Sequence, residues 1–296
     1  MRIRHRVIVS LSILLCMFTM PSLSYSKALS PKAETSLGYA YYFGRGVPQD
    51  YYTAVYWWGK AAAQGYAAGE SNLGDAYYNG QGVPKNYYTA VYWWGKAAAQ
   101  GYAAGEYDLG YAYWHGQGVP QNYYTAVHWY RKAAAQGDAG AESNLGVAYY
   151  FGHGVPQNYY TAVYWSGKSA AQGYAKGEYD LGYAYGHGQG VPQDYYTAVH
   201  WYRKAAAQGY AGAENNLGVA YSCGQGVPQN YYTAVYWYRK AAAHGDAWAE
   251  SNLGYKYQHG QGVPQNYHTA VYWYRKAAAQ GDATAQRNLN AIQKPK

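Results

Sequence analysis

The chain has 296 residues, of which 49% are hydrophobic and only 13% are charged, and its formal net charge is +8 at pH 7. This composition excludes an intrinsically disordered chain, because disorder requires few hydrophobic residues and a high density of charge. Two cysteines are too few to build a disulfide framework, so side-chain packing has to hold the fold together. Tyrosine supplies most of the large rings, with 43 Tyr against 3 Phe and 11 Trp.

The first 26 residues differ from the rest of the chain. Three arginines precede a mostly apolar run over residues 7–20, and a proline and several small serines follow it. This order is typical of a secretory signal peptide, with cleavage after Ser24 or Ser26. An uncleaved membrane anchor is the alternative, but the run is shorter than the ~20 residues that a spanning helix requires. We therefore predict a signal peptide over residues 1–26 and export to the periplasm or out of the cell.

From residue 27 to residue 292 the chain is a tandem repeat with a period of 36 residues. A Val-Pro pair recurs at this spacing without a slip, at Pro48, Pro84, Pro120, Pro156, Pro192, Pro228 and Pro264. One short module cannot bury its own apolar face and must pack against its neighbour. The period predicts a solenoid of seven repeats, with its function on a surface and not in a pocket.

Each module is predicted to contain two helices. In the unit over residues 66–101, the first helix spans about residues 67–79 and ends at Gly80, because glycine readily adopts the left-handed conformation that ends helices. A Val-Pro turn follows, and Asn86 caps a second helix over about residues 87–100.

The two ends of the repeat array also carry helix signals. Ser30-Pro31 is a cap followed by a proline at the first helical position. A lone polar helix over about residues 282–292 is expected to cover the last apolar face, as a solenoid requires for solubility. We therefore predict an all-α protein of fifteen helices, with residues 293–296 as a frayed tail.

The repeated string L-G-x-x-Y…G-x-G-V-P-x-[D/N]-Y…A-V-x-W…K-A-A-A-x-G resembles the Sel1-like repeat, a relative of the tetratricopeptide repeat. The resemblance covers all seven units, from about residue 33 to residue 281. In the second unit the motif residues are Leu73, Gly74, Tyr77, Gly80, Gly82, Val83, Pro84, Asn86, Ala90, Trp93, Lys96, Ala97, Ala98 and Gly101. The resemblance implies a right-handed superhelix of helix pairs, a concave partner-binding surface and a non-enzymatic adaptor role. For exported bacterial members it implies a role in envelope assembly or in contact with a host.

Comparison of the copies separates two faces of the first helix. The leucine and the tyrosine four residues after it are constant and mark the packed side. The positions two, five and six residues after the leucine vary, lie on the opposite face and often carry rings. We predict that this face is concave and binds a partner, although drift of unrestrained positions is the alternative. Its candidate residues are Tyr39, Tyr42, Tyr78, Tyr111, Trp114, His115, Tyr150, Phe151, Tyr183, His187 and Tyr255. Because these rings should point away from the core, replacing Tyr111, Trp114 and Tyr150 by alanine is expected to leave stability nearly unchanged.

No residue pattern predicts a catalytic or metal site. His115, His187 and His259 are evenly spaced, but they lie two repeats apart, too far for one ion to join them. No nucleophile has a base at a workable spacing. We therefore predict no catalytic residue, no metal and no cofactor.

The predicted function is an exported, non-enzymatic scaffold that binds a protein or peptide through the concave face. A module that binds a carbohydrate or peptidoglycan fragment by aromatic stacking is the alternative. Nucleic acid is not expected as a partner, because export separates the protein from it and no lysine and arginine stripe tracks a phosphate backbone. The mature form is expected to be soluble, without a membrane span.

Overall fold

The computed structural model describes residues 29–293, which form fifteen α-helices and no strand. The first helices of the pairs are α1 (Pro31–Phe43), α3 (Ala67–Asn79), α5 (Ala103–His115), α7 (Ala139–Phe151), α9 (Ala175–His187), α11 (Ala211–Cys223) and α13 (Ala247–His259), and α15 (Ala283–Gln293) follows alone. The second helices are α2 (Tyr51–Ala63), α4 (Tyr87–Ala99), α6 (Tyr123–Ala135), α8 (Tyr159–Ala171), α10 (Tyr195–Ala207), α12 (Tyr231–Ala243) and α14 (Tyr267–Ala279). The predicted all-α architecture of seven helix pairs and a terminal helix is confirmed. The predicted signal peptide and residues 294–296 of the predicted tail lie outside the described residues.

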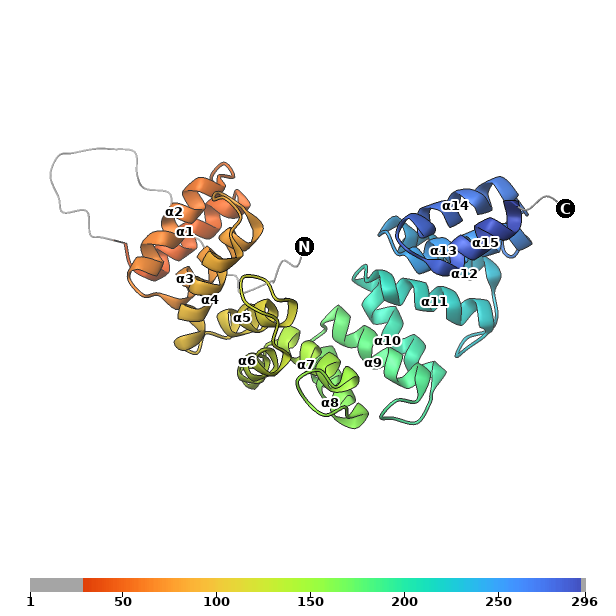
Figure 1. The fold of residues 1–296 in the computed structure, drawn as a ribbon, viewed down its shortest axis with the longest axis horizontal. Helices are drawn as coiled ribbons and strands as arrows, with labels where there is room; N and C mark the ends of the chain where they lie inside the picture. The colour runs from red at the N-terminus through yellow and green to blue at the C-terminus, as the bar shows by residue number, and fades with distance from the viewer. Residues whose placement is uncertain (1–28, 294–296) are drawn as a thin grey trace.

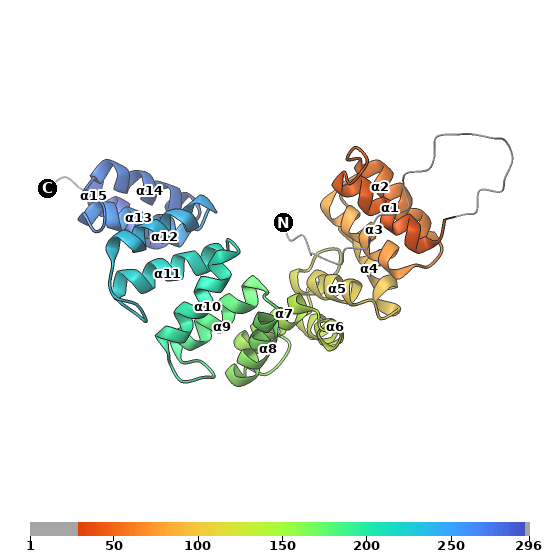
Figure 2. The ribbon, with the colours of Figure 1, turned by 180° about the vertical axis from the view of Figure 1, so that it is seen from behind.

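The helix pairs form an open arc, with α1 and α2 at one end and α14 and α15 at the other (Figures 1 and 2). Each pair, which we call repeats 1 to 7 in chain order, packs most extensively within itself and then against the next first helix. Most neighbouring first helices also contact each other, α7 and α9 most extensively, whereas contact of this extent is absent between consecutive second helices of the described chain. Elements on the inside of a curve lie closer together than those on the outside. The first helices therefore line the concave side and the second helices the convex side.

The helix ends follow the predicted capping chemistry. The Asn86 side chain accepts a hydrogen bond from the Thr89 amide at 3.1 Å. An Asp or Asn caps each of the other six second helices in the same way. Each of the seven paired first helices ends at a glycine with a φ between 64° and 73°. In repeat 4, Asp138 also caps the first helix, by accepting from the Ala141 amide at 2.9 Å. Local sequence thus sets where the helices begin and end.

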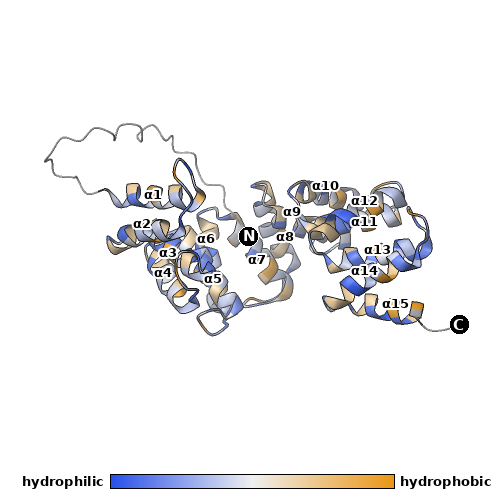
Figure 3. Cartoon of the chain, turned by 90° about the horizontal axis from the view of Figure 1, so that it is seen from above, coloured by the Kyte–Doolittle hydropathy of each residue, from blue (hydrophilic) through white to orange (hydrophobic). Residues whose placement is uncertain are grey.

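The core consists of thin clusters between successive helices. Hydrophobic and hydrophilic residues are mixed along every helix (Figure 3), and no thick apolar layer forms. In repeat 3 the glycine that follows the constant leucine lets a ring pack directly on the helix backbone. A Cβ atom on Gly110 would lie 2.8 Å from the ring of Tyr130, which is fully buried. The constant Leu-Gly pair therefore has a packing role.

None of the helices between residues 29 and 293 is longer than 13 residues, and none meets the length and apolarity that a membrane span requires.

Seven buried glutamates, one in each first helix of a pair, are a feature that the sequence analysis did not identify. They are Glu34, Glu70, Glu106, Glu142, Glu178, Glu214 and Glu250. Glu142 accepts a hydrogen bond from the Gln172 amide at 2.7 Å, and the Lys168 ammonium lies 3.2 Å from its other carboxylate oxygen. The same two partners recur in every repeat except repeat 6, where His244 replaces the glutamine at 2.9 Å from Glu214. Each network ties the first turn of a first helix to the end of its second helix.

Candidate functional site: the concave face

Several of the predicted residues form a continuous row of rings in the middle of the concave face. The Trp114 and His153 ring centroids lie 5.6 Å apart, and those of His153 and Phe151 lie 5.7 Å apart. Phe151 contacts Tyr150 at 4.7 Å, and Tyr150 reaches Tyr183 of the next repeat at 6.1 Å. The row therefore crosses repeats 3, 4 and 5. His153 belongs to the turn of repeat 4, and the sequence analysis missed it although most other repeats have glutamine there.

Pairs of rings one helical turn apart extend this face in both directions. Tyrosine and histidine rings pair in the odd-numbered repeats after the first, with centroid distances of 4.2 Å for Tyr111 and His115, 3.9 Å for Tyr183 and His187 and 4.3 Å for Tyr255 and His259. In repeat 1, Tyr39 stacks on Phe43 instead. Burial lowers the pKa of His115, so its ring stays neutral at physiological pH. The exposed parts of these pairs offer flat contact area.

The rings five residues after the leucine lie between repeats, and the expectation that they point away from the core is wrong. Tyr42 packs against Tyr51 and Trp58 of its own repeat, with centroids 5.1 and 5.3 Å away. Its hydroxyl donates to the Gln81 side-chain oxygen in the turn of the next repeat at 2.7 Å. Burial also raises the pKa of the Tyr42 hydroxyl. This position therefore ties neighbouring repeats together.

The same bond recurs in two further repeats. The Tyr78 hydroxyl donates to the Gln117 side chain at 2.9 Å, and the Tyr150 hydroxyl donates to that of Gln189 at 2.6 Å. Trp114 has no hydroxyl at this position, and its ring packs on Tyr130 with centroids 6.0 Å apart. The predicted site thus contains two kinds of ring, exposed ones and structural ones.

We expect replacement of Tyr150 by alanine to lower the free energy of unfolding by roughly 1–3 kcal/mol, because a ring contact and an inter-repeat hydrogen bond are lost. Replacement of the adjacent Phe151, which is 59% exposed, should change it by about 0.5 kcal/mol or less. Thermal and urea unfolding followed by circular dichroism measures both variants. Equal effects of the two substitutions would show that the ring of Tyr150 does not join the repeats.

Repeat 6 lacks the inter-repeat tyrosine, and a lysine of repeat 7 replaces it. Ser222 stands at the ring position, and Lys256 is buried where the other six repeats have alanine. The Lys256 ammonium donates to the Ser222 hydroxyl at 2.6 Å and to the Gln261 side-chain oxygen at 2.8 Å. It also lies 4.5 Å from the centroid of the Tyr231 ring. Burial lowers the pKa of this amine. Gln261 thus receives from an ammonium the bond that Gln81, Gln117 and Gln189 receive from a tyrosine.

Trp248 is a second residue of the concave side that the sequence analysis missed. Its side chain is 63% exposed and lies near the start of α13, where the first helices of the preceding repeats have Ala, Gly or Lys. It borders a shallow hollow of about 250 Å³ between α11, α13 and α15. The other side chains that line the hollow are polar, namely Asn215, Ser251, Asn252, Asp282 and Thr284. A tryptophan where the preceding copies have Ala, Gly or Lys was the signal that could have found it.

The most exposed aromatic side chains lie on the convex side, which the sequence analysis did not consider as a site. One tyrosine at the start of six second helices is 77–78% exposed, at Tyr52, Tyr88, Tyr124, Tyr160, Tyr196 and Tyr232. Exposed rings therefore occupy both sides of the arc.

Among residues 29–293, no three His, Cys, Asp or Glu side chains come close enough together to hold a metal ion.

Tandem helix pairs whose first helices line a concave side define an α/α repeat solenoid, a class in which each repeat contacts mainly its neighbours. The chain belongs to the Sel1 repeat family. The family's sequence model matches residues 31–66, 67–102, 103–138, 139–174, 175–210, 211–246 and 249–282. The predicted family is therefore confirmed.

Two solved structures show the same fold at substantial sequence identity. The chain is 40% identical to a protective antigen present in uropathogenic Escherichia coli strains, with a TM-score of 0.70, over 88% of this chain and 56% of that one. It is 34% identical to a Sel1 repeat protein from Oxalobacter formigenes, with a TM-score of 0.68, over 89% of this chain and 76% of that one. The chain thus spans little more than half the length of the E. coli antigen. A comparison with curated proteins gave no match.

Proposed function

We propose that the protein is an exported, non-enzymatic scaffold that binds a protein or peptide partner through the concave face. The observation that carries this proposal is the continuous row of rings from Trp114 through Phe151 to Tyr183 across three repeats. Solenoids typically use such extended concave surfaces for binding. Aromatic anchors near the centre of an interface supply most of its binding energy.

The side chains of the concave face vary from repeat to repeat, which favours a folded protein or a peptide of specific sequence as the partner. The position six residues after the leucine holds an exposed ring in several repeats, as at His115, Phe151 and His187, but asparagine in repeat 2 and cysteine in repeat 6. A different side chain at each step of the arc can match a partner surface that itself changes along its length. The similarity to a protein described as a protective antigen supports contact with a host as the setting. Envelope assembly remains the second setting that family membership suggests.

A glycan is the alternative ligand of this face, and the hollow beside Trp248 favours it. An exposed indole flanked by amide, hydroxyl and carboxyl groups offers a stacking surface together with hydrogen-bonding groups for a sugar ring. Isothermal titration of residues 27–296 with cell-wall oligosaccharides tests this alternative. Saturable binding that is lost in Trp248→Ala and kept in Phe151→Ala would support it over the protein partner.

The main proposal is tested with residues 27–296 as bait, against envelope extracts and host-surface extracts in parallel. We expect a captured partner whose affinity falls about tenfold or more when His115, Phe151 and His187 are all changed to alanine, because exposed anchor rings are lost. Tyr160→Ala on the convex side is the matched control and should bind like the wild type. If the triple variant keeps every interaction of the wild type, the variable face reflects drift and the proposal fails.

Export makes a separate prediction about the N-terminus. Mass spectrometry of the protein from its native cell is expected to show chains that begin at Tyr25 or Lys27, because the segment before them has the order of a cleaved signal peptide. A chain that retains Met1 in the soluble fraction would contradict export.

A further inference from the structure

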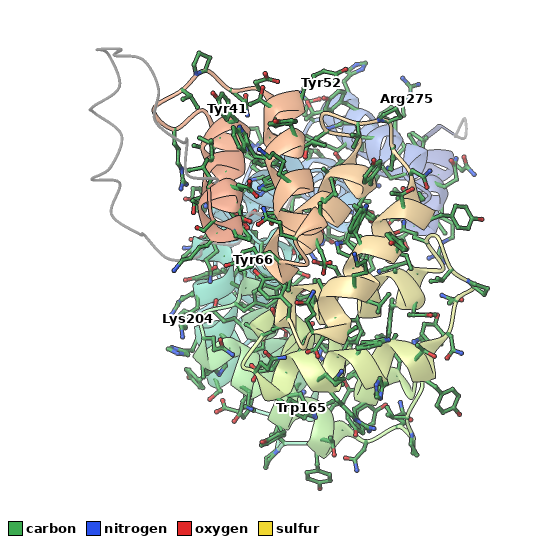
Figure 4. The ribbon with its side chains drawn as sticks, turned by 90° about the vertical axis from the view of Figure 1, so that its left-hand side faces the viewer. Tyr41, Tyr52, Tyr66, Trp165, Lys204 and Arg275 are labelled. Atoms are coloured by element: carbon green, nitrogen blue, oxygen red, sulfur yellow. The ribbon has the colours of Figure 1, made fainter. Side chains whose placement is uncertain are left out.

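Each second helix presents a stripe of side chains to solvent on the convex side, and the stripe begins with the same tyrosine in repeats 1 to 6. In repeat 3 the stripe runs through Tyr124, His128, Arg131 and Lys132, which lie on one face because residues three and four apart are neighbours on a helix. The first ring of the stripe is 77–78% exposed in repeats 1 to 6. Within residues 29–293, the hydroxyl groups of these six tyrosines make no hydrogen bond. Figure 4 shows the equivalent Tyr52 of repeat 1, together with Arg275 of repeat 7, at the edge of the molecule.

The fold does not account for these tyrosines. A ring that is three-quarters exposed adds little to stability, and surface substitutions at such places usually change it by about 0.5 kcal/mol or less. The exposed positions of the concave face differ between copies, yet the convex tyrosine is identical in six repeats and only repeat 7 departs, with His268. Neutral sequence drift would have changed the exposed residues on both the concave and the convex side. A requirement shared by repeats 1 to 6 therefore acts on the convex tyrosines.

The charge of the convex side is positive, and it is concentrated in the second half of the arc. The second helices contain no Asp or Glu, and each of their lysines lies within 3.9 Å of a buried glutamate that balances its charge. Four repeats add an arginine directly before that lysine, at Arg131, Arg203, Arg239 and Arg275, where the other three have Gly59, Gly95 and Gly167. These arginines are the surplus charge.

Three of the arginines are held in place by a tyrosine of the next repeat. Arg131, Arg203 and Arg239 each donate from Nη2 to a tyrosine hydroxyl, at 2.8, 3.0 and 2.7 Å. A guanidinium has five N–H donors, so one such bond orients it and leaves others for a carboxylate. The arginine follows the exposed tyrosine by seven residues, about 10 Å along the same side of the helix. The stripes of repeats 3, 5 and 6 thus offer an exposed ring and an oriented cation.

We propose that the convex face binds an acidic polysaccharide, whose sugar rings stack on the exposed tyrosines and whose carboxylates pair with the arginines. Six identical exposed tyrosines at a constant step of 36 residues fit a ligand that is itself a repeating polymer. A folded protein would demand different side chains at successive steps, as the concave face provides. The absence of acidic residues from the second helices and the surplus arginines make the face complementary to negative charge. The two sides of the arc then bind two chemically different partners.

The test is titration of residues 27–296 with polygalacturonate, a linear polymer of a uronic acid, by calorimetry at low and high salt. Two variants separate the two contributions. The first changes all four arginines to glycine, the residue that repeats 1, 2 and 4 already carry at this position. The second changes Tyr124, Tyr196 and Tyr232 to alanine. We expect each variant to bind about tenfold or more weakly, and salt to weaken the wild type, because screening reduces charge pairing.

Controls decide between an acidic sugar polymer and other ligands. Polyglutamate carries the carboxylates without sugar rings, and dextran carries the rings without charge; both should bind the wild type much more weakly than polygalacturonate. Phe151→Ala on the concave side should bind polygalacturonate like the wild type. Lack of binding by the wild type, equal binding of polyglutamate, or unchanged binding by the tyrosine variant would overturn the proposal. Because the altered tyrosines are exposed, this variant tests the proposal even if the arginine variant fails to fold.

Discussion

Replacing Glu142 by alanine is expected to lower the free energy of unfolding by roughly 2–4 kcal/mol, through the loss of charge-assisted hydrogen bonds and a cavity in the packed interface. The carboxylate is buried between α7 and the end of α8, where it binds Gln172 and Lys168. Glu142→Gln keeps the volume and loses the charge, so an intermediate loss is expected. The network should therefore contribute more than a surface ion pair, which is typically worth ~0–1 kcal/mol.

Urea unfolding together with native-state hydrogen exchange measures this effect. Exchange is needed because a repeat array can open locally without global unfolding, and protection should fall first in α7 and α8. Tyr160→Ala is the matched control in the same repeat, because it removes an exposed ring from α8. A Glu142→Ala variant that is as stable as this control would show that the buried carboxylate is not needed to join the two helices.

Replacing Gly118 by alanine is expected to cost several kcal/mol, while the same change at Gly46 costs about 1 kcal/mol. The two glycines occupy the same place in the turn of repeats 3 and 1, with φ of 75° and 73°. A side chain at either place meets the same backbone penalty. Only at Gly118 would the new Cβ atom overlap the carbonyl group of Tyr87 in the preceding repeat, whereas nothing lies within 4 Å at Gly46. The difference between the two variants isolates the close approach of neighbouring repeats.

Thermal unfolding of both glycine variants provides the measurement. A larger residue at Gly118 should also increase the hydrogen exchange of α4 and α5, because the junction between repeats 2 and 3 has to open. Equal losses at both positions would mean that the turn does not press against the preceding repeat in solution.

The sequence by itself determined the period, the helix bounds and the side of the first helix that faces outward. These features depend on chemistry within a few residues, such as the Asn86 cap, the glycine that ends each first helix and the spacing of the constant leucines. Family membership followed from the same short-range spacing. The concave face and most of its exposed rings were therefore predicted from the sequence.

The contacts between repeats were decided only by the tertiary structure. A glutamate normally lies on the surface, so the pattern gave no reason to place Glu142 in the core, and its partners lie 26 and 30 residues further along the chain. The ring of Tyr150 shares the outward side of its helix with Phe151, yet the turn of the next repeat, at Gln189, covers it. Periodicity tells which way a side chain leaves its own helix. It does not tell which distant segment arrives to cover that side chain, because this depends on how each repeat is rotated against the next.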